Sequence, residues 1–229
     1  MIVHNVRNPF VIEAEKVAAM NDEQDEQEDQ DEIAAQEWYD QKSALMVGIL
    51  GEEHNMVMHA IIPYAIGGGL DLYYFPNGIE GTAVATKELS EIPGEGSSND
   101  VFDFYELVMF TRLPISLDDA QNESTAFGQV HGSINAILNS IASYSAQATL
   151  NPHETCEFPE DFERIGGKCL IFDAYGSDED HSEFGLLLVM EIHRSEMDFA
   201  RKNGGEKLIA KLKKAGVYPY SDMDRSAVV

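Results

Sequence analysis

The order of apolar and polar residues along the chain predicts a series of short strands. Segments with alternating or nearly continuous apolar residues, rich in β-branched and aromatic types, are typical of strands. They lie in residues 55–66, where the strand is expected to end near Pro63, and in residues 70–75, 82–86, 101–111, 168–174 and 184–192. The last of these segments, FGLLLVMEI, is almost wholly apolar, which predicts a central strand covered on both faces.

Helical patterns flank these strands. Residues 10–20 and 33–46 contain good helix formers and few breakers. In residues 130–146 the apolar positions fall on one helical face, at Val130, Ile134, Ile137, Leu138 and Ile141. A final helical pair follows residue 193 and is interrupted at Gly204-Gly205. We therefore predict an α+β fold with a mixed, mostly antiparallel central sheet and flanking helices.

Two regions differ in composition. Residues 1–50 are predicted to form an N-terminal helical and acidic segment, and residues 51–229 a single α+β domain. Within the first region, residues 21–32 read NDEQDEQEDQDE and contain eight acidic residues. A run of this kind is solvated, and it either joins the two N-terminal helical stretches or interrupts them.

The chain as a whole is strongly acidic. It contains 15 Lys and Arg and 41 Asp and Glu among 229 residues, a formal charge of −26. Residues 191–229 hold eight basic and six acidic residues, a balance of +2 that leaves −28 on residues 1–190. This charge excludes direct binding of nucleic acid and of an anionic membrane surface. It fits two interpretations, simple solubility and the steering of a basic partner protein.

The sequence also indicates a cellular compartment. No apolar run approaches the roughly 20 residues of a membrane-spanning helix, and the first residues lack the pattern of a signal peptide. Cys156 and Cys169 fit neither a disulfide framework nor a CxxC site. We expect a cytoplasmic protein with reduced thiols, and Cys169 buried in an apolar strand.

No motif for catalysis, a cofactor or a metal is found, so none of the three is predicted. The arrangement nearest to metal-ligand spacing is His193 with Glu196, three residues apart, and Glu191 close by. We expect His193 to act in helix capping or hydrogen bonding instead. Ser195 is the expected N-cap, with Glu196 near the positive end of the helix dipole.

Four segments, in order, resemble the suppressor-of-fused (SUFU) domain family. LDLYYFPN at 70–77 resembles an exposed strand of the family, and YELVMFTRLP at 105–114 resembles its "EL…LP" strand. The helix at 130–146 with the following Pro152-His153 resembles a later helix and its ending. The run from Leu186 to Leu212 resembles the closing strand and helix. The family's "TxGMS" segment falls at 85–90, where Thr86 and Ser90 match.

The resemblance, to the bacterial type of this family, implies a non-enzymatic protein-binding domain. Bacterial members include immunity proteins that neutralise toxins, so the implied partner is a protein, and a basic toxin is one case. Asp71, Tyr73 and Tyr74 are candidate partner contacts, because tyrosine is frequent at binding hot spots. The alternative is a small-molecule-binding protein or an enzyme with an unrecognised pocket, which a perturbed carboxylate beside His193 would favour. The oligomeric state stays open.

Overall fold

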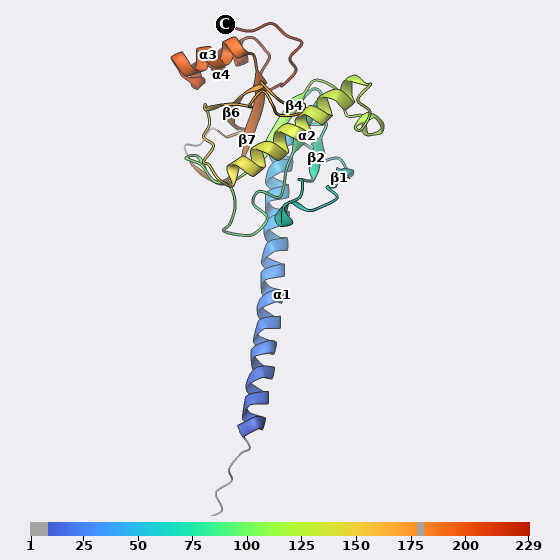
Figure 1. The fold of residues 1–229 in the computed structure, drawn as a ribbon, viewed down its shortest axis with the longest axis vertical. Coiled ribbons are helices and arrows are strands. Elements are labelled where there is room, and N and C mark those ends of the chain that lie inside the picture. Colours follow the sequence, from blue (N-terminus) through green and yellow to red (C-terminus); the bar gives the residue numbers. More distant parts are fainter. Residues whose placement is uncertain (1–8, 178–180) are drawn as a thin grey trace, which may run out of the picture.

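A computed structural model describes residues 9–177 and 181–229 (Figure 1). The elements in chain order are α1 (Pro9–Leu50), β1 (Val57–Met58), β2 (Leu72–Phe75), β3 (Thr82–Ala85), β4 (Phe102–Thr111), α2 (Ala126–Ser145), β5 (Thr155–Glu157), β6 (Cys169–Tyr175), β7 (Ser182–Ile192), α3 (Arg194–Asn203) and α4 (Gly205–Lys214). Short 3-10 turns lie at Tyr64–Ile66 and Leu117–Asp119. Among the described helices, none combines the length and the apolar character that a membrane span needs.

The seven strands form one sheet in the order β1-β2-β3-β4-β7-β6-β5. β4 and β7 run parallel, and every other neighbouring pair is antiparallel. This arrangement confirms the predicted α+β class and its mixed, mostly antiparallel sheet. β7 lies between β4 and β6, and its residues from Phe184 to Ile192 are all buried, as the apolar run predicts.

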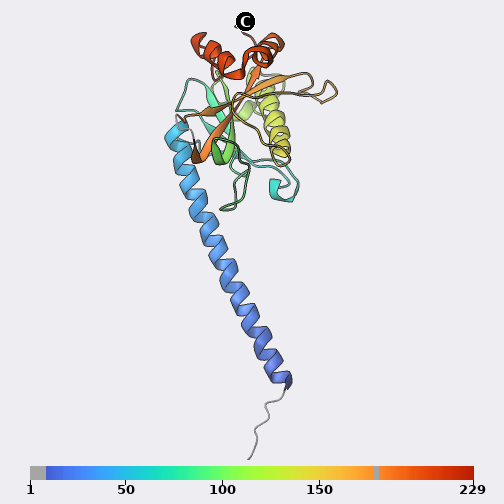
Figure 2. The same ribbon diagram turned by 90° about the vertical axis from the view of Figure 1, so that its left-hand side faces the viewer.

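Helices cover both faces of the sheet. α2 lies on one face and buries Ile134, Ile137, Leu138 and Ile141 against it. The C-terminal part of α1 lies on the other face together with α3 and α4. Figure 2 shows α1 and α2 on opposite sides of the strands. The structure therefore has three layers, and the strands in the middle are buried on both sides.

Two boundaries differ from the sequence-based predictions. The strand predicted from residue 55 to near Pro63 is wrong beyond its start, because within this stretch Val57–Met58 alone pairs with β2. The chain then turns around Pro63, and Ile61 and Ile62 are exposed instead of facing a core. α2 begins earlier than predicted because Thr125 is its N-cap and accepts a hydrogen bond from the backbone of Gly128. Cys169 is buried in β6, as predicted.

α1 is one continuous helix of 42 residues, so the acidic run joins the two predicted helical stretches. At 1.5 Å per residue its axis is about 63 Å long. Its C-terminal part packs on the domain, and the buried residues there form a stripe spaced by four: Trp38, Lys42, Met46 and Leu50. The N-terminal part extends away from the other elements (Figure 1). The described side chains at 31–37 are exposed or half-buried.

The stripe on α1 contains a fully buried ion pair. Lys42 Nζ donates to Glu106 Oε1 at 3.1 Å, and both side chains are 0 % exposed. The same ammonium group donates to the carbonyl oxygens of Lys87 and Ser90, at 2.5 and 2.8 Å. Burying an ammonium group is costly unless its donors are satisfied, and these acceptors satisfy them.

Glu106 on β4 is equally well bonded. It accepts from the Thr86 hydroxyl at 2.7 Å, from the backbone N–H of Leu89 at 3.2 Å, and from the N–H and hydroxyl of Ser90 at 3.0 and 2.8 Å. Thr86 and Ser90 are the two residues of the 85–90 segment that match the family pattern. Both bind Glu106, which itself lies in the 105–114 segment that resembles the family. These bonds fix residues 86–90 beneath α1.

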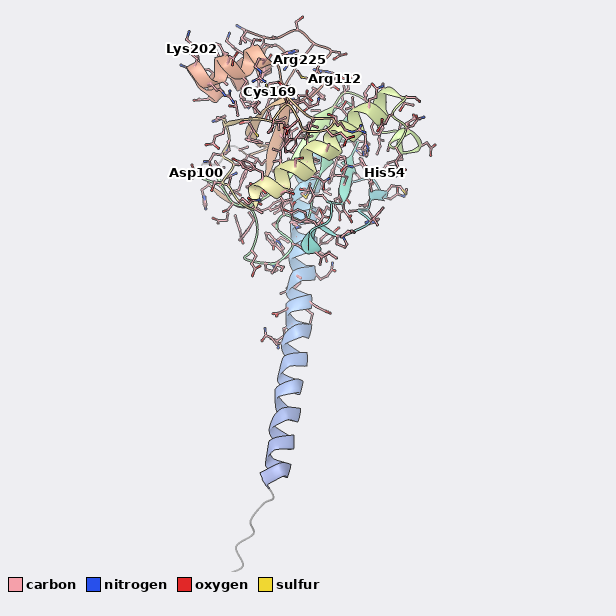
Figure 3. The ribbon with its side chains drawn as sticks, in the orientation of Figure 1. His54, Asp100, Arg112, Cys169, Lys202 and Arg225 are labelled. Atoms are coloured by element: carbon pink, nitrogen blue, oxygen red, sulfur yellow. The ribbon has the colours of Figure 1, made fainter. Side chains whose placement is uncertain are left out.

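Replacing Lys42 by Met should destabilise the protein by about 3–5 kcal/mol, because Glu106 would stay buried without its cation. Urea unfolding followed by circular dichroism measures the loss. The control is Lys202→Met, at an exposed position of α3 (Figure 3), which should change stability by less than about 0.5 kcal/mol. Similar losses in the two variants would show that the buried pair has no special role in stability.

Candidate partner-binding surface

A cavity of about 310 Å³ lies between α1, the start of β2 and the loop at 59–69. Three tyrosines line it, Tyr39 from α1, Tyr64 from the 3-10 turn and Tyr73 from β2. The ionisable side chains that line it are His59, Asp71, Lys87, Glu88 and Glu91. We call this feature the acidic cavity, because three of these residues are carboxylates.

Lys87 is held firmly in the wall of the acidic cavity. Its Nζ donates to Glu53 Oε2 at 2.7 Å and to Ser43 Oγ at 3.0 Å, and its side chain is 2 % exposed. The same nitrogen lies 4.9 Å from the ring centre of Tyr39 and 4.5 Å from that of Tyr73. The ion pair with Glu53 and the cation–π contacts with the two tyrosines stabilise the charge of Lys87 within the protein, so this charge is not presented to a partner.

Asp71 orders the loop that forms the opposite wall. Its Oδ1 accepts from the backbone N–H of Ala60 at 2.8 Å, and its Oδ2 accepts from His59 Nδ1 at 2.6 Å. The Asp71 side chain is 23 % exposed, so one edge of this carboxylate still reaches solvent. The residue thus combines a structural bond with an accessible charge.

Glu88 has an unusual environment. Burial is the main cause that raises the pKa of its carboxyl to about 8, and the negative charges of Glu106 and Asp71 raise it further. Burial and the charge of Glu88 also raise the pKa of Tyr73. Part of the shift comes from neighbouring negative charge, so a positively charged group placed beside Glu88 would favour its ionised form.

The three predicted contact residues lie on two different faces of the sheet. Asp71 and Tyr73 line the acidic cavity together. Tyr74 points to the opposite face, is 0 % exposed, and donates a hydrogen bond to His131 Nε2 at 2.8 Å. His131 donates from Nδ1 to the Ala120 carbonyl, and burial lowers its pKa. Tyr74 therefore offers no surface to a partner. Tyr73 is only 8 % exposed and can be reached only from the cavity, and contact through Asp71 and Tyr73 stays a prediction.

Other residues of the acidic cavity were not singled out from the sequence. Tyr39 comes from α1. Lys87 and Glu88 lie between Thr86 and Ser90, the two positions of the 85–90 segment that match the family pattern. They are far apart in sequence and belong to no motif, so only the fold brings them together. The available signal was the position of Lys87 and Glu88 immediately beside Thr86, within a segment that the resemblance already marked.

The residues around His193 form a structural clamp. His193 is the N-cap of α3, which confirms its predicted capping role, whereas the prediction of Ser195 as N-cap is wrong. Glu196 accepts from the His193 backbone N–H at 2.8 Å and from both terminal nitrogens of Arg225 at 2.6 and 2.8 Å. Arg225 lies near the C-terminus (Figure 3). Glu191 instead pairs with Lys168 at 2.7 Å, so the structure does not join it to this cluster.

The charge state of Glu196 follows from these bonds. Burial raises its pKa, but Arg225 and the backbone donors outweigh burial and hold the pKa below its ordinary value of 4.5. A carboxylate held ionised by an arginine is suited to fixing the C-terminal segment, not to exchanging protons. Within residues 9–177 and 181–229, no group of three or more His, Cys, Asp and Glu is arranged to hold a metal ion.

The overall structure resembles solved structures of suppressor-of-fused proteins. One is a chain of the Sufu–Fu complex, with a TM-score of 0.55 and 14 % identity, over 85 % of this chain and 92 % of that chain. Another is a SUFU homologue from Neisseria gonorrhoeae FA 1090, with a TM-score of 0.50 and 12 % identity, over 80 % and 92 %. No protein-family profile and no curated protein sequence matches the chain. The likeness confirms the predicted SUFU-like domain as a fold.

The Glu196–Arg225 clamp should make stability depend on pH. Because the folded protein holds the pKa of Glu196 below 4.5, the clamp contributes fully above this value and is lost as pH falls through the lower, folded pKa. The stability gap between the wild type and Arg225→Met should therefore be largest near about pH 7 and narrow towards about pH 3. Urea unfolding at several pH values measures it. Lys214→Met, exposed at the end of α4, should show a small gap at every pH.

Glu88 should have the opposite effect on stability. Its pKa of about 8 in the folded protein means that its ionisation opposes folding. The contribution of Glu88 to the free energy of unfolding therefore falls as pH rises from about 4.5 to about 8. Glu88→Gln should match the wild type near about pH 4 and be more stable near about pH 9. Glu91→Gln, at an exposed position, is the control. If Glu88→Gln is no more stable than the wild type near about pH 9, a raised pKa of the Glu88 carboxyl is excluded.

Proposed function

We propose that this protein is a non-enzymatic domain that binds another protein, and that Asp71 and Tyr73 lie at the contact surface. The observation that carries the proposal is the combination of the acidic cavity with an apolar rim. The loop at 59–69 forms one wall of the cavity and leaves Ile61, Ile62 and Ile66 in solvent, at 101 %, 55 % and 76 % exposure. Clustered exposed apolar side chains of this kind mark interaction sites.

The chemistry of the acidic cavity favours a basic partner. Asp71 and Glu91 supply negative charge, and a cation beside Glu88 would favour the ionised form of its carboxyl, whose pKa is about 8. Lys87 does not cancel this preference, because its charge is already paired with Glu53. A lysine or arginine side chain of the partner fits the site, and the chain's charge of −26 would speed the approach of a basic protein.

The structural comparison supports a protein as the partner. One of the proteins that share this fold was solved in a complex with Fu. We extend the proposal to an immunity-type inhibitor that acts in the cytoplasm and neutralises a basic toxin. The support for this extension is the acidity of residues 1–190 and the cation-binding character of the cavity.

The alternative, a small-molecule-binding protein or enzyme, has one observation in its favour. A carboxyl group with a pKa near 8 in a cavity is a feature of sites that transfer protons. The volume of about 310 Å³ lies at the small end of the roughly 300–1,000 Å³ of ligand pockets. A small molecule that binds the purified protein, and loses affinity in Glu88→Gln, would favour this alternative.

The test compares two matched aspartates. Asp71 lies beside β2 and pairs with His59, and Asp103 lies on β4 and pairs with His181. A partner captured with the tagged full chain is purified, and its Kd is measured by calorimetry at low and high salt. Asp71→Asn should weaken binding about tenfold and Asp103→Asn less than about twofold, with affinity falling as salt rises. Equal affinity of the two variants would contradict the assigned surface.

A further inference from the structure

The projecting part of α1 has a charge pattern that is unfavourable for an isolated helix. Its sequence contains no Lys or Arg between Lys16 and Lys42. Acidic residues instead recur four positions apart, as in Asp22 with Glu26 and Glu28 with Glu32. Like charges at this spacing destabilise a helix, and most helices in proteins gain their stability from packing. A positively charged segment alongside would relieve this repulsion.

A groove of about 660 Å³ runs beside α1 where it reaches the domain. Its lining residues are Glu32, Ile33, Ala35, Gln36, Tyr39 and Glu91. The floor is partly apolar, and Ile33 is 60 % exposed. Ile92, the neighbour of Glu91, is 54 % exposed. The lining of the groove therefore combines apolar side chains with two carboxylates, Glu32 on α1 and Glu91 on the loop after β3.

We propose that this groove is a docking site for a basic amphipathic helix of a partner protein. A groove formed along one side of a straight helix suits a second helix laid against it, with apolar residues inserted at i, i+3 and i+4. Leucine-like side chains of the partner would cover Ile33 and Tyr39. Its lysines or arginines would lie opposite Glu32 and Glu91, and a further one opposite Asp31, which precedes Glu32 on α1.

Charge complementarity selects this occupant over a second copy of the chain. Two copies of α1 side by side would place the acidic runs together, and residues 1–190 carry −28. The basic excess in residues 191–229 is only +2. The groove also differs from the surface proposed above, because it shares Tyr39 and Glu91 with the acidic cavity but neither Asp71 nor Tyr73.

The test uses a fluorescent amphipathic peptide of lysine and leucine as the probe, with a glutamate–leucine peptide of the same pattern for comparison. Fluorescence anisotropy with the full chain should show binding of the lysine peptide alone, weakening as salt rises. Ile33→Ser should weaken binding about tenfold, because it removes an apolar contact from the groove. Met56→Ser, at a similarly exposed residue outside both the groove and the acidic cavity, should change it less than about twofold.

A second pair of variants tests the charge. Glu32→Gln should weaken binding of the lysine peptide about threefold, and Glu163→Gln, exposed elsewhere on the domain, should leave it unchanged. Equal losses in the groove and control variants would mean non-specific attraction to an acidic protein and would overturn the proposal. Absence of binding, or light scattering that shows a dimer blocking the groove, would overturn it as well.

The two proposals fail in different ways. Loss of lysine-peptide binding in Asp71→Asn but not in Ile33→Ser would place the peptide in the acidic cavity and overturn the docking groove. A natural partner that depends on Asp71 and is insensitive to Ile33→Ser would support the proposed function and overturn the docking groove. A partner with the reverse dependence would support the groove and contradict the assignment of the contact surface to Asp71.

Discussion

The buried pair of Lys42 and Glu106 is the constraint on which the arrangement of this protein depends. It joins α1 to β4, and the carbonyl groups that Lys42 also binds belong to the 86–90 segment. The indole N–H of Trp38 donates to the same Ser90 carbonyl at 2.6 Å. These bonds place α1 over the sheet in a single orientation. Both the acidic cavity and the groove are consequences, because each has α1 as a wall.

The distribution of charge follows from the same arrangement. The cations that approach the cavity, Lys42 and Lys87, are buried and already paired with Glu106 and Glu53. The carboxylates that line the acidic cavity are Asp71, Glu88 and Glu91, and Asp71 pairs with His59. Among these carboxylates, Glu88 has a raised pKa, because burial and the neighbouring negative charges act on it in the same direction. A basic ligand would bring a positive charge close to these carboxylates and would favour their ionised forms.

The sequence predicts the elements better than the site. β7 and α2 are recognisable because continuous or periodic apolar residues report burial directly. The 55–66 segment is apolar yet forms a loop, because pairing ends after Met58 and burial there depends on neighbours that the sequence does not reveal. Adjacent residues of a strand face opposite sides, so Tyr73 and Tyr74 were never able to share one surface. Tyr39, Lys87 and Glu88 meet through long-range contacts alone, which no local pattern encodes.

The anchoring of α1 by residues spaced four apart has a consequence for how this protein can change during evolution. Each residue of a helix advances the chain by about 100° around the axis. Inserting or deleting one residue between the acidic run and Trp38 would leave the core untouched and turn every position of the projecting arm by that angle. Three or four residues together would nearly restore the original direction. The stripe therefore fixes the direction in which each residue of the arm points. Changes in the length of the arm keep that direction only approximately, in steps of three or four residues.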